Sequence, residues 1–542
     1  MSANYQNILA ISIRDYGAVA DGVTDCSAAI IAAAAAAGAG NRPIAFDGGD
    51  FWIASNTSIE VPVYFAPGAR VSGPSNITFA MQGGVIAGDH QVFYGDLALA
   101  CYRPTIARAE WFGAITGRGD LDAAPAISKA LTVFPVVHLL PGIYYCTATI
   151  QVGSQTLEGA GRSRTVIYNN HPTNHIINAS GVRSSSTYIE RPTIARLTGT
   201  RTVTPTTPAN TADDLNQGHG LHIDMASNPI VEEVDMYNNL IDFYWANTLS
   251  AYWNNSLSIM SSGGASDRRY SFYIDSENNG QPFQPNLVFR AKEIRQSNQS
   301  GAGSTYGMVL QGSFTDHDIE RLETAGCHES LWLKGTGGNV HIRSAWLDAF
   351  KANGVRIDNS GHGNNVTFMD LYIAPGVGAS GSCIAANQAE NTQFIGTQIT
   401  SFPGGGEGKS GAVFTNSVNC VLQGAVVNHS TGVTLNNCYG CSIDVSASQF
   451  NSSGSGVDVI KVSGGYANKL VAACIGVTGS VGYGTGVALS QTGANTVDLT
   501  RVLDSAVGNR LTIDGNPVSG AGNVAGSQFV IRPGAFINTS AT

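Results

Sequence analysis

Long hydrophobic runs are absent from this chain of 542 residues. No run reaches the roughly 18 consecutive apolar residues that a transmembrane helix needs. The first residues, MSANYQNILA, also lack the basic segment and the apolar stretch of a secretory signal. We therefore expect no membrane insertion, and the sequence carries no visible secretion signal.

Charged residues are also scarce, at 13% of the chain, and the net charge is −10. No basic patch is apparent that could neutralise the phosphates of a nucleic acid. Nucleic acid is therefore not expected as a partner, whereas a neutral or weakly charged polymer fits the composition.

Cysteine and histidine give little sign of a metal site. The nine cysteines are scattered and odd in number, which favours a reduced compartment over a disulfide framework. Cys438 and Cys441 have no second Cys pair or histidine nearby, so we expect ordinary buried or turn thiols. His219 and His222 are three residues apart in an expected strand and should point to opposite faces. We therefore expect no metal ion and no cofactor.

A short phrase recurs along the chain from Gly220 onward. It alternates apolar and polar residues, as in GMVLQ, SLWLK and GVRID, and a turn residue follows it. Its starts at 307, 330, 354, 382, 411, 432 and 457 are 21 to 29 residues apart. Alternation that ends in a turn indicates a short strand, and a period in this range indicates a solenoid.

A second apolar cluster follows each phrase, with inward candidates at positions i, i+3 and i+5. Because one extra residue stands between i and i+3, we expect a corner between two strands. Few segments have helical spacing, and Val, Ile, Thr, Ser, Asn and Gly dominate. The prediction is an all-β fold, a right-handed single-stranded parallel β-helix. The inward sets are Ile319/Leu322/Thr324, Ile342/Ala345/Leu347, Phe368/Leu371/Ile373 and Phe394/Thr397/Ile399.

The N-terminal part contains a degenerate duplication. The string DYGAVADGVTD leads to an Ala-rich helix expected at about 27–37, and WFGA with DLD leads to a second helix near 123–131. Asp25 and Asp122 stand just before these helices, where their side chains can accept the first free amide hydrogens. We expect both helices to cap the solenoid, whose first coil would otherwise expose strand edges.

These motifs resemble the opening of the pectate-lyase-like β-helix family found in bacteriophage tailspikes. DYGAVADGVTD with SAAI, then WFGA, DLDAAPAI, LLPGIYY and LEGAG carry the resemblance over about residues 10–170. It implies a homotrimeric tailspike in the virion, attached to the phage tail or baseplate directly or through an adaptor protein. It also implies binding and cutting of bacterial lipopolysaccharide O-antigen or capsular polysaccharide.

Three regions are expected along the chain. Residues 1–170 would form the capping region and first coils, and 171–480 the main β-helix with the glycan-binding surface. Residues 481–542 lose the repeat period and are predicted to form a small β-rich region for trimer contacts.

Aligning the inward sets brings four outward side chains into one row: Glu323, Trp346, Tyr372 and Gln398. Residues in neighbouring coils would stack roughly 4.8 Å apart. Aromatic rings stack on the apolar faces of sugars, and polar groups bind the hydroxyls, so this row is a candidate sugar-binding strip. The alternative is an ordinary outer row that packs against a neighbouring subunit.

The leading catalytic candidates are Glu323 and Asp348. Asp348 lies one coil up and two residues along, which puts the two Cβ atoms roughly 8 Å apart. This distance suits an inverting glycosidase, and apolar neighbours such as Trp346 could raise the pKa of one carboxyl. Asp316, in an acidic cluster, and Glu293, one coil earlier, are the competing carboxylates.

Further substrate-binding candidates are basic or aromatic. Arg321 and Arg343 lie in the same coils, and Tyr252 and Trp253 belong to an aromatic cluster in a chain with only 8% aromatic residues. A polysaccharide lyase remains an alternative, with Arg290, Arg321, Arg343 or Lys334 as base. The other alternative is a fibre that binds glycan without cutting it.

Overall fold

The computed structural model describes residues 10–40, 42–103, 106–205, 207, 215–260, 268–276, 288–298, 304–313, 316–358, 364–401, 410–429, 431–448, 458–474, 483–490, 495–502, 507–513, 516–517 and 528–530. The chain forms two compact units. Unit 1 contains residues 1–206 and 216–236, and unit 2 contains residues 207–215 and 237–542. The predicted boundaries at 170 and 481 differ from this division and stay predictions.

Unit 1 is built from parallel strands that stack in ladders, as expected for a β-helix. Its first coils form the ladders β1 (Ile11–Ser12), β3 (Ile44–Phe46), β6 (Val63–Phe65), β9 (Val85–Ala87); β2 (Asp21–Asp25), β4 (Gly49–Trp52), β7 (Ala69–Ser72); and β5 (Thr57–Ile59), β8 (Thr78–Met81), β10 (Ala98–Cys101). Later coils contain β11 (Ile106–Arg108), β12 (Val136–His138), β15 (Thr156–Glu158), β19 (Thr193–Arg201); β13 (Gly142–Cys146), β16 (Thr165–Asn169); β14 (Ile150–Gln151), β17 (Ile177–Ser180), β20 (His219–Asp224); and β18 (Ile189–Glu190), β21 (Ala226–Ser227).

The predicted duplication and both helices are confirmed. The helices are α1 (Ser27–Ala39) and α2 (Ala124–Val133), and a 3₁₀ turn precedes each, at Ile13–Tyr16 and Ala109–Phe112. Both turns end at a glycine with φ near +93°, Gly17 and Gly113, a conformation that other residues rarely adopt. Asp25 accepts from the Ser27 amide and Asp122 from the Ala124 amide, each at 3.0 Å.

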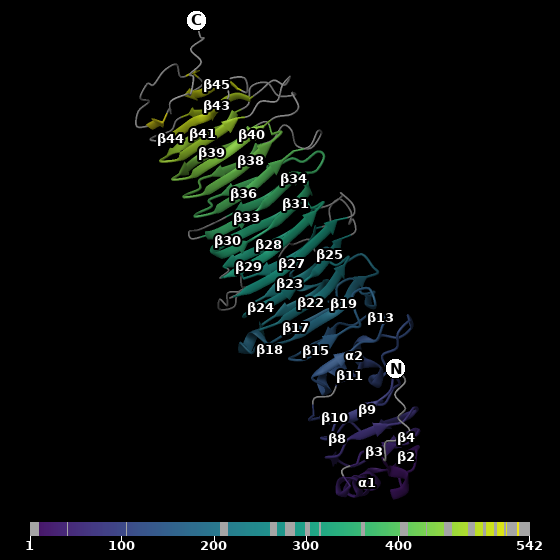
Figure 1. The fold of residues 1–542 in the computed structure, drawn as a ribbon. Coiled ribbons are helices and arrows are strands. Elements are labelled where there is room, and N and C mark those ends of the chain that lie inside the picture. Colours follow the sequence, from purple (N-terminus) through teal and green to yellow (C-terminus); the bar gives the residue numbers. More distant parts are fainter. Residues whose placement is uncertain are drawn as a thin grey trace. The chain divides into compact units, whose positions relative to one another are not determined.

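Unit 2 consists of two long series of parallel strands, and the recurring phrases form the first (Figure 1). The first series is β23 (Ile241–Ala246), β26 (Arg268–Asp275), β28 (Ser304–Ser313), β30 (Glu329–Ile342), β32 (Asn353–Asp358), β35 (Ile384–Asn387), β37 (Ser410–Thr415), β39 (Thr431–Tyr439), β41 (Asp458–Tyr466), β43 (Tyr483–Ser490) and β45 (Val507–Ile513). The second is β24 (Ala251–Asn254), β25 (Ser256–Met260), β27 (Phe289–Asn298), β29 (His317–Ala325), β31 (Ala345–Phe350), β33 (Asn364–Met369), β34 (Leu371–Pro375), β36 (Gln393–Thr400), β38 (Val421–Val427), β40 (Ser442–Ser448), β42 (Lys469–Cys474), β44 (Thr496–Val502) and β47 (Gln528–Val530). The last part of β30, residues 338–342, also belongs to this second series, since it pairs with β29 and β33. The predicted all-β parallel β-helix is confirmed.

The core of unit 2 follows the predicted inward sets. All twelve side chains of these sets are buried, from Ile319 to Ile399. The extra residues between i and i+3 form the expected corner, where Asp370 and Gly396 have φ values of 50° and 66°. Alternating burial on either side of the corner fixes which side chains face outward.

The C-terminal region is β-rich as predicted, but its described strands continue the solenoid. β43 pairs in parallel with β41 and β45, and β44 pairs with β42 and β47. The sequence period fades there although the backbone pairing persists. A short antiparallel strand, β46 (Asn516–Pro517), folds back on β45.

Two other expectations concern single features. Cys438 and Cys441 are buried free thiols, as predicted. Within the described ranges, neither helix is long and apolar enough to cross a membrane.

Candidate functional site

The predicted outward row exists as a register ladder in unit 2. Glu323 of β29 pairs with Trp346 of β31, Trp346 with Tyr372 of β34, and Tyr372 with Gln398 of β36. Arg295 of β27 extends the row below Glu323. Because the neighbours of these residues in the strand are buried, the row faces outward.

The two aromatic rings of the row stack on each other. The ring centroids of Trp346 and Tyr372 are 4.1 Å apart, with an interplanar angle of 26°. Trp346 is 52% exposed, although an indole is among the most apolar side chains. Partial burial and the negative charge of Asp348 raise the pKa of Tyr372, which keeps its hydroxyl neutral. An exposed aromatic platform beside a carboxylate and an amide therefore has the elements of a sugar-binding strip.

The two leading carboxylates have the relative position that the sequence predicted. Asp348 pairs with Ala325, two residues beyond Glu323 on β29, so strand geometry again puts the Cβ atoms about 8 Å apart. Glu323 accepts a hydrogen bond from Arg321. Trp346, the register partner of Glu323, is exposed, whereas Leu347 beside Asp348 is buried.

The register of Glu293 is defined by the pairing of β27 with β29. Glu293 pairs with Arg321 and not with Glu323, so it lies at the corner and outside the row. Its carboxylate is 3.0 Å from Arg295 and 3.7 Å from Arg321. Glu293 therefore belongs to a network of alternating charges that also contains Glu323.

A cavity of about 660 Å³ lies on the other side of the corner. Its main row consists of Arg290, Asp318 and His341, which pair in register. Arg343 binds Asp318 through two hydrogen bonds of 2.7 and 3.0 Å, which raise the pKa of the guanidinium. The cavity is lined by Val288, Arg290, Asp316, His317, Asp318, His341, Arg343, Met369 and Asp370.

Sequence reasoning found this cavity only in part. Asp316 and Arg343 were candidates, and both line it; Asp316 accepts from Asn339 at 3.1 Å. Tyr252, also a candidate, pairs with Arg290 and so lies on the same row. Asp318 and His341 each stand one position before an inward residue. The positions directly before the inward sets, at i−1, are therefore the sequence signal for the row Arg290, Asp318 and His341.

The prediction that Trp253 binds substrate is wrong. Trp253 is 1% exposed and packs against Phe243, Phe272 and Phe289, with ring centroids 4.6 to 6.3 Å apart. The aromatic cluster is therefore largely core, because large rings fill the interior of these coils.

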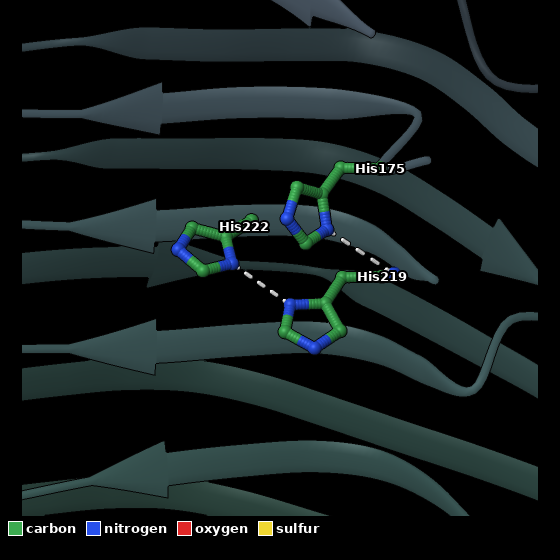
Figure 2. Close-up of side chains that lie close together, drawn as sticks. All are labelled: His175, His219 and His222. Carbon is green, nitrogen blue, oxygen red and sulfur yellow. Dashed lines mark hydrogen bonds between the residues drawn. The ribbon is translucent and has the colours of Figure 1, made fainter. Parts of the chain in front are cut away.

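The prediction that His219 and His222 face apart is also wrong. Their Nδ1 atoms are 2.8 Å apart, and His175 lies beside both (Figure 2). The pairing of β20 with β17 begins only at Leu221, so strict alternation does not extend back to His219. Burial, with Arg201 nearby, lowers the pKa of His175 to about 4, and burial also lowers that of His222. The imidazoles of His175 and His222 are therefore neutral at neutral pH.

No protein-family model matches the sequence, and no curated protein matches it. Solved structures similar to this chain include tailspike protein 3 of bacteriophage CBA120, at 11% identity over 80% of this chain and 62% of that chain, with a TM-score of 0.48. The pre-mature gene product 12 of bacteriophage phi29 has 12% identity over 76% and 57%, with a TM-score of 0.48. An α-1,3-glucanase catalytic unit from Streptomyces thermodiastaticus has 11% identity over 78% and 70%, with a TM-score of 0.35. The chain thus spans less than two thirds of either phage protein, and we base its function on its own residues.

Proposed function

We propose that this chain is a phage tailspike depolymerase that hydrolyses internal glycosidic bonds of a bacterial O-antigen or capsule. One observation carries the proposal: an exposed Trp346–Tyr372 stack shares a row with Glu323 and Gln398. Apolar ring faces bind the faces of pyranose rings, while the carboxylate and amide bind hydroxyls. The role in the virion and the homotrimer rest on the sequence resemblance alone.

The proposed mechanism uses Glu323 and Asp348 as general base and general acid. Cβ atoms about 8 Å apart let the two carboxyl groups reach the separation of roughly 6.5–9.5 Å that inverting enzymes use, which leaves room for a water molecule between carboxyl and sugar. Glu323 is ion-paired with Arg321. This pairing suits the general base, because a general base acts as an ionised carboxylate. The acid role then goes to Asp348, which donates its proton to the leaving glycosidic oxygen.

A second candidate function, polysaccharide lyase, is favoured by the cavity. Arg290 and Arg343 would face the carboxylate of a uronate there, and the exposed His341 offers a base for the proton next to it. Arg343 already binds Asp318, so an acidic sugar would have to compete with that carboxylate. Because Arg343 is already paired with Asp318, we propose hydrolysis rather than elimination as the main function.

Cleavage products separate these functions. The full chain would be incubated with purified surface polysaccharides, and reducing ends and the ultraviolet absorbance of unsaturated uronates would be followed together. Reducing ends without absorbance are expected. Both signals rising together would establish a lyase, and binding without either signal would establish a non-cleaving fibre.

A further inference from the structure

Three histidines from two successive coils of unit 1 meet at one point (Figure 2). His175 lies two residues before β17, and His219 stands at the start of β20. Since Ile177 pairs with Leu221, His175 and His219 occupy equivalent positions in neighbouring coils. Their ring centroids are 4.6 Å apart, and that of His222 is 4.5 Å from His175 and 5.0 Å from His219.

The ring nitrogens, and not only the rings, come together. One ligand nitrogen from each histidine lies within 4.8 Å of the other two. The Nδ1 atoms of His219 and His222 are 2.8 Å apart, so one of them carries the shared hydrogen. The His219 amide donates to Nδ1 of His175 at 3.3 Å, which holds this ring beside the other two. Three convergent imidazoles are a ligand set for a first-row transition metal.

The surroundings of the cluster suit a tightly held ion inside the protein. His219 is fully buried and His175 is half-buried, so polysaccharide does not reach the cluster. Arg183 is paired with Asp224 at 2.5 Å, which offsets its charge. Arg201 remains a nearby cation, with its guanidinium 2.7 Å from the Asn174 carbonyl and 3.4 Å from that of His219. That charge opposes any cation, so the site would hold only an ion that imidazole nitrogen binds strongly. Ca²⁺ and Mg²⁺, which prefer oxygen ligands, do not meet this requirement.

We propose that His175, His219 and His222 bind one Zn²⁺-class transition-metal ion that joins successive coils of unit 1. Tetrahedral ligands about 2.0–2.1 Å from zinc are about 3.3 Å apart, so the His219–His222 pair opens by about half an ångström. The hydrogen that the Nδ1 atoms of His219 and His222 share moves to Nε2 of the ring that carries it. Nδ1 of His175 exchanges its hydrogen bond from the His219 amide for the bond to the ion, and no proton is lost. A small ligand such as water fills the fourth position.

The ion would act as a structural clip. It ties His175 to His219, 44 residues later in the chain, and thereby closes a long loop within unit 1. The site is independent of the carboxylates and aromatic row of unit 2. If the chain does not cleave glycan, the proposed metal site therefore still stands. If the chain does not bind metal, the proposed glycan cleavage still stands.

Metal binding by the untagged full chain tests the proposal. After removal of metal with EDTA, Co²⁺ would be added as a visible probe and then displaced with Zn²⁺. We expect one Co²⁺ per chain with the absorption bands of a tetrahedral nitrogen site. His175→Gln and His222→Gln should each weaken Zn²⁺ binding by at least about tenfold. The matched control is His138→Gln, a half-buried histidine on β12 outside the cluster, and it should bind like the parent.

Two results would overturn the proposal. One is a parent chain that binds neither ion, and the other is a pair of folded variants that bind Zn²⁺ as tightly as the parent. If the variants do not fold, the thermal unfolding midpoint of the parent tests the proposed metal site instead. It should rise with Zn²⁺, fall back with EDTA and stay unchanged with Ca²⁺, since a ligand that binds only the folded state stabilises it. No shift with Zn²⁺ would contradict the site.

Discussion

The indole of Trp346 stacks on the phenol ring of Tyr372 at 4.1 Å while it remains 52% exposed. A buried stack would be a packing feature, but an exposed one keeps a large apolar surface in water. In the proposed function this surface is covered by a sugar ring when polysaccharide binds.

The first prediction concerns that surface. Trp346→Ala should raise KM about tenfold, or about 1.4 kcal/mol, and leave kcat nearly unchanged, because the ring binds ground and transition states alike. Cleavage kinetics on the polysaccharide measure both constants. Tyr466→Ala is the matched control, since Tyr466 is also exposed and contacts another aromatic ring, that of Tyr439, outside the row. Equal effects of both changes would contradict the assignment.

The second prediction separates core from surface tryptophan. Trp253→Ala should lower the free energy of unfolding by about 3–5 kcal/mol, because it removes a buried ring from the aromatic core. Trp346→Ala should cost far less. Urea unfolding of the two variants beside the parent measures this, and a small effect at Trp253 would show that its ring is not packed as described.

The third prediction is a pH dependence from Asp242. This carboxyl is fully buried and accepts from Asn239 at 2.8 Å and Ser258 at 2.5 Å, and burial raises its pKa to about 7. A raised pKa in the folded state means that the folded chain holds the proton more tightly. Stability from this group is therefore fully present below about pH 4 and is lost as the pH rises to about 7.

Asp242→Asn removes this contribution. Between about pH 5 and 7, the unfolding free energy of the parent should fall relative to that of the variant by up to about 1.4 kcal/mol per pH unit. Urea unfolding across this range measures the difference. Asp444→Asn, at a half-buried carboxyl on β40, should follow the parent. If the unfolding free energies of the parent and of Asp242→Asn change with pH in parallel, the prediction is contradicted.

The sequence predicted the solenoid and the outward row because both depend on local alternation. Ile319, Ile342, Phe368 and Phe394 each start an inward set, and buried positions of this kind leave a period-two signal that survives in a single sequence. Both capping helices were predicted for a similar reason, since Asp25 and Asp122 act on backbone groups only two residues away.

The errors arose where side chains depend on contacts between coils. Trp253 and Trp346 look alike in sequence, and only the packing of neighbouring coils buries one and exposes the other. The meeting of His219 with His222 depends on how β20 begins, and His175 comes from another coil altogether. Alternation within a strand cannot predict such contacts.

The most direct test of the central claim compares the parent with the double variant Glu323→Gln, Asp348→Asn. On a polysaccharide that the parent cuts, the variant should release reducing ends about 10²–10⁴ times more slowly, because it lacks both the general acid and the general base. It should still bind the polymer through Trp346, and Asp444→Asn should cut at the parent rate. A double variant that folds, binds and cuts within about tenfold of the parent would contradict the claim that this row is the catalytic site.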